Sequence, residues 1–101
     1  MRVVVTAKAK ADLLAIRSFI EAHNPELAVS FTEELLDRSE ALADNNPRAY
    51  ALVARYERFG IRRCVQANYL IFYRLQQEVI EVIHIIQGAR DMEALLFRSP
   101  N

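Results

Sequence analysis

The spacing of the apolar residues changes near residue 52 of this chain, after a long helical part. Before that point apolar side chains recur every three or four positions, as on one face of an α-helix. After it they alternate with polar side chains, as in a β-strand. The chain has only two glycines and three prolines, so it offers few places for a turn. This pattern predicts an α+β fold in which a helical part precedes a sheet.

The dipeptide Asn24-Pro25 divides the helical part in two. Asn24 suits an N-cap and Pro25 the first position of a second helix, which we expect to end at residues 44–47. The first helix, expected from Ala9 onwards, would bury Leu13, Ile16, Phe19, Ile20 and His23, and the second would bury Ala28, Phe31, Leu35, Leu36 and Leu42. The sequence therefore predicts an α-hairpin, preceded by a short strand of β-branched residues at positions 2–6.

Three strand-like runs follow the hairpin: Ile61–Gln66, Tyr69–Leu75 and Val79–Gln87. Two or three residues connect each run to the next, which is too short for a parallel crossover, so we expect an antiparallel three-stranded meander. Asp91–Phe97 is expected to form a short C-terminal helix. The predicted order is β-α-α-β-β-β with that helix at the end, in a single domain covering residues 1–101.

The charges balance in total but are separated along the chain. The 13 basic and 13 acidic residues give a net charge of zero, which argues against a polybasic nucleic-acid binder. Residues 12–44 contain eight acids and two arginines, whereas residues 55–74 contain five arginines and one acid. Arginine suits the recognition of phosphates and carboxylates. The alternative is that both regions are simply solvated faces.

Nothing in the sequence indicates secretion or a membrane. Cys64 is the single cysteine and cannot form an internal disulfide. The apolar runs are far shorter than the roughly 20 residues of a membrane-spanning helix, and no signal peptide is recognisable. We therefore expect a cytoplasmic protein with no membrane partner.

The familiar catalytic and metal-binding patterns are also absent. Cys64, His23 and His84 lack the spacing of a nucleophile motif or a metal site, so no cofactor and no metal are expected. We interpret Cys64 as a small hydrophobic residue and His84 as a histidine of the core or of a sheet face whose hydrogen bonds are satisfied within the fold, in place of a general base. An arginine and tyrosine group remains, which could contact a nucleic-acid backbone or an acidic protein: Arg62, Arg63, Tyr69, Tyr73, Arg74 and Arg90.

Several segments occur in an order that is typical of one protein family. They are a helix reading Ala-x-x-Asp-Leu-x-x-Ile-x-x-Phe-Ile from Ala9 to Ile20, Asn24-Pro25, Ala28-x-x-Phe31, Gly60-Ile61-Arg62, Tyr69–Arg74 and Ile85–Asp91. The chain thereby resembles ParE-type toxins of bacterial type II toxin–antitoxin modules, within the RelE/ParE superfamily. The resemblance implies a small toxin that is neutralised by a ParD-like antitoxin. It also implies that the toxin is connected to DNA only indirectly, through this antitoxin.

The superfamily contains two classes of toxin, and the resemblance bears on both. RelE-like members cleave mRNA on the ribosome, and characterised ParE-like members inhibit DNA gyrase. Arg63 and Arg90 match two basic positions of the RelE-like ribonuclease set, whereas Ile61, Leu70 and Leu96 replace a lysine, an arginine and a tyrosine. Loss of several groups that act as a unit removes most of a catalytic rate. The resemblance thus favours a gyrase inhibitor that is not an enzyme.

The sequence gives only a short set of candidate site residues. Those for contact with the target are Arg62, Arg74 and Arg90, and those for catalysis are Arg63, Tyr73 and Arg90. It does not identify the residues that bind the antitoxin. The alternatives are a ribosome-dependent endoribonuclease and a non-toxic module that only binds an antitoxin.

Overall fold

The computed structural model describes residues 1–88 of the chain. Its elements are β1 (Arg2–Val5), α1 (Ala7–Glu21), α2 (Pro25–Glu40), the 3₁₀ turns η1 (Ala41–Asp44), η2 (Pro47–Ala49) and η3 (Glu57–Phe59), then β2 (Ile61–Gln66), β3 (Tyr69–Gln76) and β4 (Val79–Gln87). The predicted order β-α-α-β-β-β is confirmed. The helix predicted over Asp91–Phe97 lies outside the described residues.

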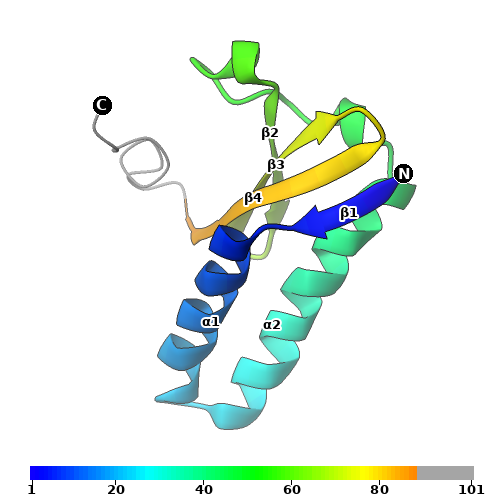
Figure 1. The fold of residues 1–101 in the computed structure, drawn as a ribbon. Helices are drawn as coiled ribbons and strands as arrows, with labels where there is room; N and C mark the ends of the chain where they lie inside the picture. Colours follow the sequence, from blue (N-terminus) through cyan, green and yellow to red (C-terminus); the bar gives the residue numbers. More distant parts are fainter. Residues whose placement is uncertain (89–101) are drawn as a thin grey trace.

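The four strands form one mixed sheet in the order β1-β4-β3-β2 (Figure 1). β2, β3 and β4 make the antiparallel meander that their short connections predict. β1 pairs with β4 in the parallel direction, with Arg2 opposite Val79 and Val5 opposite Val82. This pairing brings the N-terminus beside the last strand and makes β1 an edge strand.

Both helices begin at side chains that cap them. The N–H of Leu27 donates to Asn24 Oδ1 at 3.1 Å, and Pro25 occupies the first turn of α2, as predicted. α1 begins at Ala7, two residues before the predicted start, because the Thr6 hydroxyl accepts a hydrogen bond from the N–H of Ala9 at 3.2 Å. β1 accordingly ends at Val5, before the residue that the sequence assigned to the strand.

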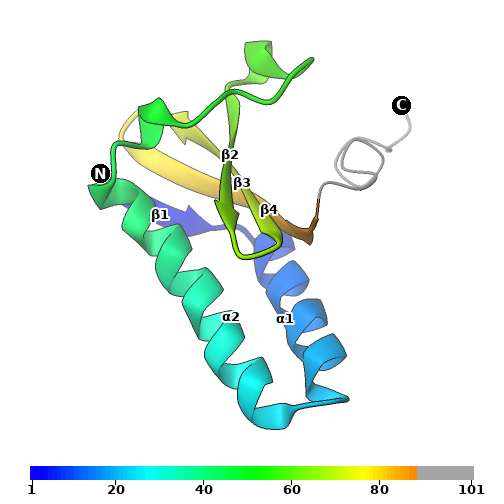
Figure 2. The same ribbon diagram turned by 180° about the vertical axis from the view of Figure 1, so that it is seen from behind.

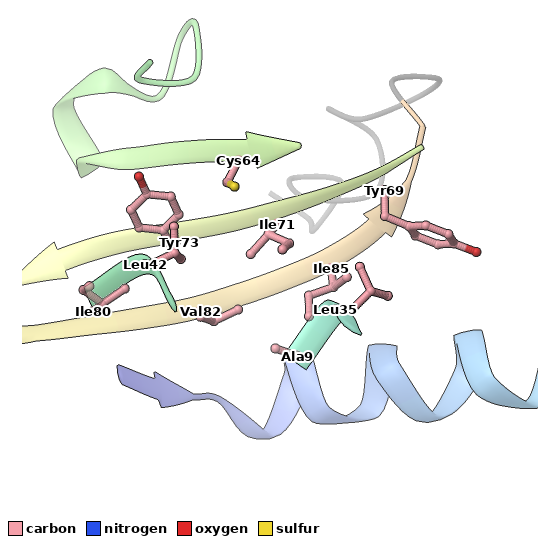
Figure 3. Packing of buried hydrophobic residues seen from close by; sticks show 10 residues of the cluster. All are labelled: Ala9, Leu35, Leu42, Cys64, Tyr69, Ile71, Tyr73, Ile80, Val82 and Ile85. Atoms are coloured by element: carbon pink, nitrogen blue, oxygen red, sulfur yellow. The ribbon is translucent and has the colours of Figure 1, made fainter. Parts of the chain in front are cut away.

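The helices pack on one face of the sheet and bury the main core there (Figure 3). This cluster comprises Ala9, Leu35, Leu42, Cys64, Tyr69, Ile71, Tyr73, Ile80, Val82 and Ile85. A second cluster covers the other face, where Val53, Ile61, Leu70 and Phe72 pack with Tyr56, Ile83 and Ile86. β3 is therefore buried on both faces, since its alternating side chains enter both clusters.

The tip of the hairpin departs from the sequence prediction. Phe19 and His23 were expected to be buried, but both are exposed, and 65% of Phe19 is accessible to solvent. The physical reason is the length of the helices, which run well beyond the sheet so that their tip has no sheet to pack against (Figures 1 and 2). The ring of Phe19 instead contacts that of His23 edge-on, with the centroids 6.2 Å apart.

Candidate functional site

Strand β1 leaves part of its backbone without a partner strand. The N–H groups of Arg2 and Thr6 each donate to a carbonyl oxygen within residues 78–82 at 3.1 Å. Backbone groups of successive strand residues point in alternate directions, so the N–H and C=O groups of Val3 and Val5 point away from β4. No strand among residues 1–88 pairs with that side of β1. Four hydrogen-bonding groups are therefore available to an additional strand.

A groove of about 860 Å³ lies beside this edge, between β1 and the two helices. All three elements supply its apolar lining: Val3, Val4 and Val5 from β1, Leu13 and Leu14 from α1, and Leu36 from α2. The basic lining residues, Arg2, Lys10 and Arg17, belong to β1 and α1, whereas the acidic ones, Glu33 and Glu40, belong to α2. The groove thus has an apolar lining, one basic side and one acidic side. Such a surface suits an amphipathic segment of a partner.

Thr6 joins the edge strand to the helix that forms the wall of the groove. Its hydroxyl accepts from the N–H of Ala9 and donates to Val82 O at 2.8 Å. Its backbone N–H donates to the same carbonyl oxygen. One residue therefore ends β1, begins α1 and ties both to β4.

Asp12 occupies the edge of β4 where β1 has ended. One carboxylate oxygen accepts a hydrogen bond from the N–H of Ile85 at 3.0 Å and lies 3.2 Å from His84 Nδ1, while Lys8 Nζ lies 3.1 Å from the other oxygen. Burial acts to raise the pKa of Asp12, but the bonds from His84, Ile85 and Lys8 outweigh it and lower that pKa below its ordinary value. His84 therefore has the structural role that the sequence indicated.

The structure separates the arginines that the sequence grouped together. Arg62 lies opposite Tyr73 in the sheet register, and Tyr73 belongs to the cluster under the helices. Arg74 lies opposite Ile61, which belongs to the cluster on the other face. Arg62 and Arg74 thus lie on opposite faces of the sheet, and Arg90 lies outside the described residues.

Both of these arginines contact other groups of the chain. Arg62 Nη1 donates to the carbonyl oxygens of Tyr50 and Arg48 at 2.6 and 3.0 Å, which holds η2 and the residue after it against β2. Arg74 Nε donates to Glu81 Oε1 at 2.7 Å across the β3–β4 pair. Arg62 therefore supports the local fold, whereas the side chain of Arg74 remains 41% exposed.

The two catalytic candidates within the described chain also lie apart. Tyr73 is fully buried, and its hydroxyl donates to Pro47 O at 2.6 Å; burial raises its pKa. Arg63 is exposed and lies opposite Phe72, on the face away from the helices. The structure does not bring Arg63 and Tyr73 together.

Within residues 1–88 no group of three or more His, Cys, Asp or Glu side chains is placed to hold a metal ion. In the same part of the chain, no helix has the length and apolar character needed to cross a bilayer. Cys64 is fully buried in the main core, which agrees with its interpretation as a hydrophobic residue.

The family model described as "ParE toxin of type II toxin-antitoxin system, parDE" matches residues 3–92. The chain belongs to the ParE toxin family. Its fold is similar to a chain of the chromosomal ParDE TA system from P. aeruginosa, with a TM-score of 0.77 and 20% identity over 87% of this chain and 96% of that one. Its fold is also similar to a chain of the toxin–antitoxin complex RelBE2 from Mycobacterium tuberculosis, with a TM-score of 0.54 and 20% identity over 85% of this chain and 95% of that one. No curated protein sequence is significantly similar to this chain.

Two of the positions at which the sequence is expected to differ from the RelE-like ribonuclease set are buried. Ile61 and Leu70 are only 8% and 6% exposed. Both pack with Phe72 and Val53 in the second cluster. Both side chains therefore contribute to hydrophobic packing.

Sequence reasoning missed the groove, Thr6 and the role of Asp12. Two signals were available for the groove: the run Val3-Val4-Val5, which is β-branched throughout, and Leu14, which lies off the apolar face of the first helix. Their significance depends on β1 being an edge strand. That placement follows from the pairing with β4, which no local pattern indicates.

Proposed function

We propose that this chain is the toxin of a type II toxin–antitoxin module and that a ParD-like antitoxin neutralises it by binding in the groove beside β1. The observation that carries the proposal is the open edge of β1 next to an apolar groove, in a member of the ParE family. An edge strand with free backbone groups is a ready site for strand addition. The toxin would act in the cytoplasm and contact DNA only through its antitoxin.

The groove specifies what the antitoxin segment must provide. An extended stretch would bond to the N–H and C=O groups of Val3 and Val5, each bond contributing about 0.5–1.5 kcal/mol. Apolar side chains of the segment would cover Leu14 and its neighbours. Acidic side chains would face Lys10 and Arg17, and basic ones would face Glu33. A disordered segment that folds on binding can supply such a long, mixed contact.

Two exposed side chains with the same exposure allow a matched test of this binding site. Leu14 and Phe19 are both 65% exposed on α1, but only Leu14 lines the groove. Leu14→Asp should weaken antitoxin binding roughly tenfold or more, because burial of a leucine contributes about 1.5–3 kcal/mol. Phe19→Asp should leave it unchanged. Calorimetric titration with the purified antitoxin measures both; equal losses in the two variants would refute the groove as the binding site.

For the cellular target we propose DNA gyrase, inhibited by binding and without catalysis, which would block replication. The burial of Ile61 and Leu70 supports this choice over mRNA cleavage, because a phosphodiester transition state needs charged or polar groups around it. Tyr73, whose hydroxyl is bonded to Pro47 O, would not reach a substrate in this arrangement.

Gyrase assays with the purified toxin test the target. We expect inhibited supercoiling that the antitoxin relieves, and arrested growth on induction without the antitoxin. If gyrase stays fully active at toxin concentrations that stop growth, this target is wrong. Primer extension on translated mRNA then decides whether the ribonuclease alternative applies, and normal growth on induction would indicate a module that has lost toxicity.

A further inference from the structure

A second cleft, of about 420 Å³, lies on the face of the sheet away from the helices and shares no lining residue with the groove beside β1. Its lining consists of Thr6, Phe59, Ile61, Arg74, Glu81 and Ile83. Ile61 and Ile83 belong to the second hydrophobic cluster. The cleft therefore combines an apolar part with one ion pair, and neither is used by the proposed antitoxin contact.

The rim of the cleft presents an exposed aromatic ring in a defined position. Phe59 is 48% exposed, and the guanidinium carbon of Arg58 lies 4.9 Å from its ring centroid. The ring of Tyr56 stacks on that of Phe59, with the ring centroids 6.3 Å apart and an interplanar angle of 30°. Gly60, at φ 72°, ends η3 in the left-handed conformation that glycine adopts without strain, so the turn carrying these side chains leads directly into β2.

Arg74 adds a directed positive charge to this surface. It bonds to Glu81 through Nε, and its two terminal nitrogens form no other ion pair or hydrogen bond within residues 1–88. A guanidinium fixed in this way can still donate to a carboxylate of a partner. Arg58, over the ring of Phe59, and Arg63, on the same face of the sheet as Ile61, add positive charge near the cleft. An acidic partner complements this charge.

We propose that the second cleft recognises the protein target of the toxin, accepting an apolar side chain against Phe59 and Ile61 and a carboxylate against Arg74. The proposal rests on the toxin function proposed above and extends it by assigning the target-binding surface. Aromatic residues and arginine are the side chains that most often dominate protein–protein binding energy. The lining of the cleft holds one arginine and one glutamate. A nucleic-acid backbone is bound by several positive charges together, so this lining favours an acidic protein over nucleic acid.

Two variants at the rim and one control test the assignment in the full-length chain. Phe59→Ala removes the exposed ring, and Arg58→Glu reverses a charge while leaving that ring in place. Val65→Ala is the control, because Val65 is 54% exposed and lies at the far end of β2. The toxin level that halves the growth rate is measured by inducer titration with immunoblotting, and antitoxin affinity is measured on the same proteins as a check of folding.

We expect both rim variants to need roughly 30-fold more toxin than the wild type, with antitoxin affinity and the control unchanged. Rim variants as toxic as the wild type would overturn the cleft assignment while leaving the toxin function intact. A wild-type chain that does not affect growth would refute the toxin function and the cleft assignment with it. Each protein is also titrated with a single-stranded RNA oligonucleotide. RNA binding lost in the two rim variants would assign the cleft to nucleic acid and overturn the protein partner.

Discussion

The two edges of the sheet are completed in different ways. At the β2 edge the chain supplies its own cover, since Val53 N donates to Ile61 O at 2.8 Å and Arg63 N donates to Ala51 O at 3.2 Å. At the β1 edge no strand within residues 1–88 pairs with the outward side of Val3 and Val5. The comparison shows that the chain covers the β2 edge itself at Ile61 and Arg63, whereas the outward side of β1 has no partner strand within residues 1–88.

The edge of β4 beyond the end of β1 is closed in a third way, by a side chain. β4 continues past the end of β1, and there the carboxylate of Asp12 binds the N–H of Ile85 that a longer β1 would have bound. The open edge is thereby limited to the length of β1, beside the groove. An incoming strand would find the outward backbone groups of Val3 and Val5 there.

Removing this carboxylate should have the largest effect on stability. Asp12→Ala would lose a hydrogen bond to a charged group and leave the N–H of Ile85 unsatisfied, so we expect a loss of about 3 kcal/mol in the free energy of unfolding. Urea denaturation measures it. Asp37→Ala, which removes an exposed acid from α2, serves as the control and should change little. A loss below about 1 kcal/mol in Asp12→Ala would show that β4 does not depend on this cap.

Proline substitutions at the two edges compare them directly. Val53→Pro removes an N–H that is bonded to Ile61 and should cost about 2 kcal/mol of stability. Val3→Pro removes an N–H that faces outward, so it should leave stability nearly unchanged but weaken antitoxin binding about threefold to tenfold. Denaturation and calorimetric titration are run on both variants. Equal destabilisation by the two prolines would contradict the difference between the edges.

A smaller effect is expected where the loop that covers the β2 edge is fixed to β3. Tyr73→Phe removes the hydroxyl bonded to Pro47 O and should lower the free energy of unfolding by about 1 kcal/mol. Tyr69→Phe is the matched control, since the Tyr69 hydroxyl forms no hydrogen bond within the described chain. Thermal unfolding monitored by circular dichroism measures both variants. If they lose the same stability, the bond to Pro47 contributes nothing.

The smallest effect should be a dependence on pH that arises at Asp12. Its folded pKa lies below the ordinary value of 3.8, so the unfolded chain binds the proton more readily. The stabilisation is complete above pH 3.8 and is lost as the pH falls through the lower, folded pKa. The stability difference between wild type and Asp12→Asn should therefore narrow on acidification below 3.8, as measured by urea denaturation at several pH values. A constant difference would contradict this assignment.

The parts of the fold that sequence predicted well depend on local signals. Asn24-Pro25 marked the helix boundary, and the short connections after Gln66 and Gln76 required antiparallel neighbours. The pairing of β1 with β4 has no local signal, because its partners are far apart in sequence. The edge groove that depends on this pairing was therefore also missed.

The arginine group shows why a site is harder to predict than a fold. Arg62 and Arg74 occur on neighbouring strands, yet strand alternation and the sheet register place them on opposite faces. Arg58 and Phe59 lie in a short 3₁₀ turn without hydrophobic periodicity, so no pattern selected them. The number of arginines in a segment did not reveal which of them share a surface.

The parallel pairing of β1 with β4 also determines at which stage of synthesis the open edge of β1 can form. Thr6 and Val82, which hydrogen-bond to each other, are 76 positions apart, so the first strand made must wait for the last one. Contacts at this separation raise the contact order and slow folding. A nascent chain that has not yet reached β4 cannot position the edge to which the antitoxin would add its strand. In such a chain, neutralisation by strand addition could begin only after nearly all of the sheet had been translated.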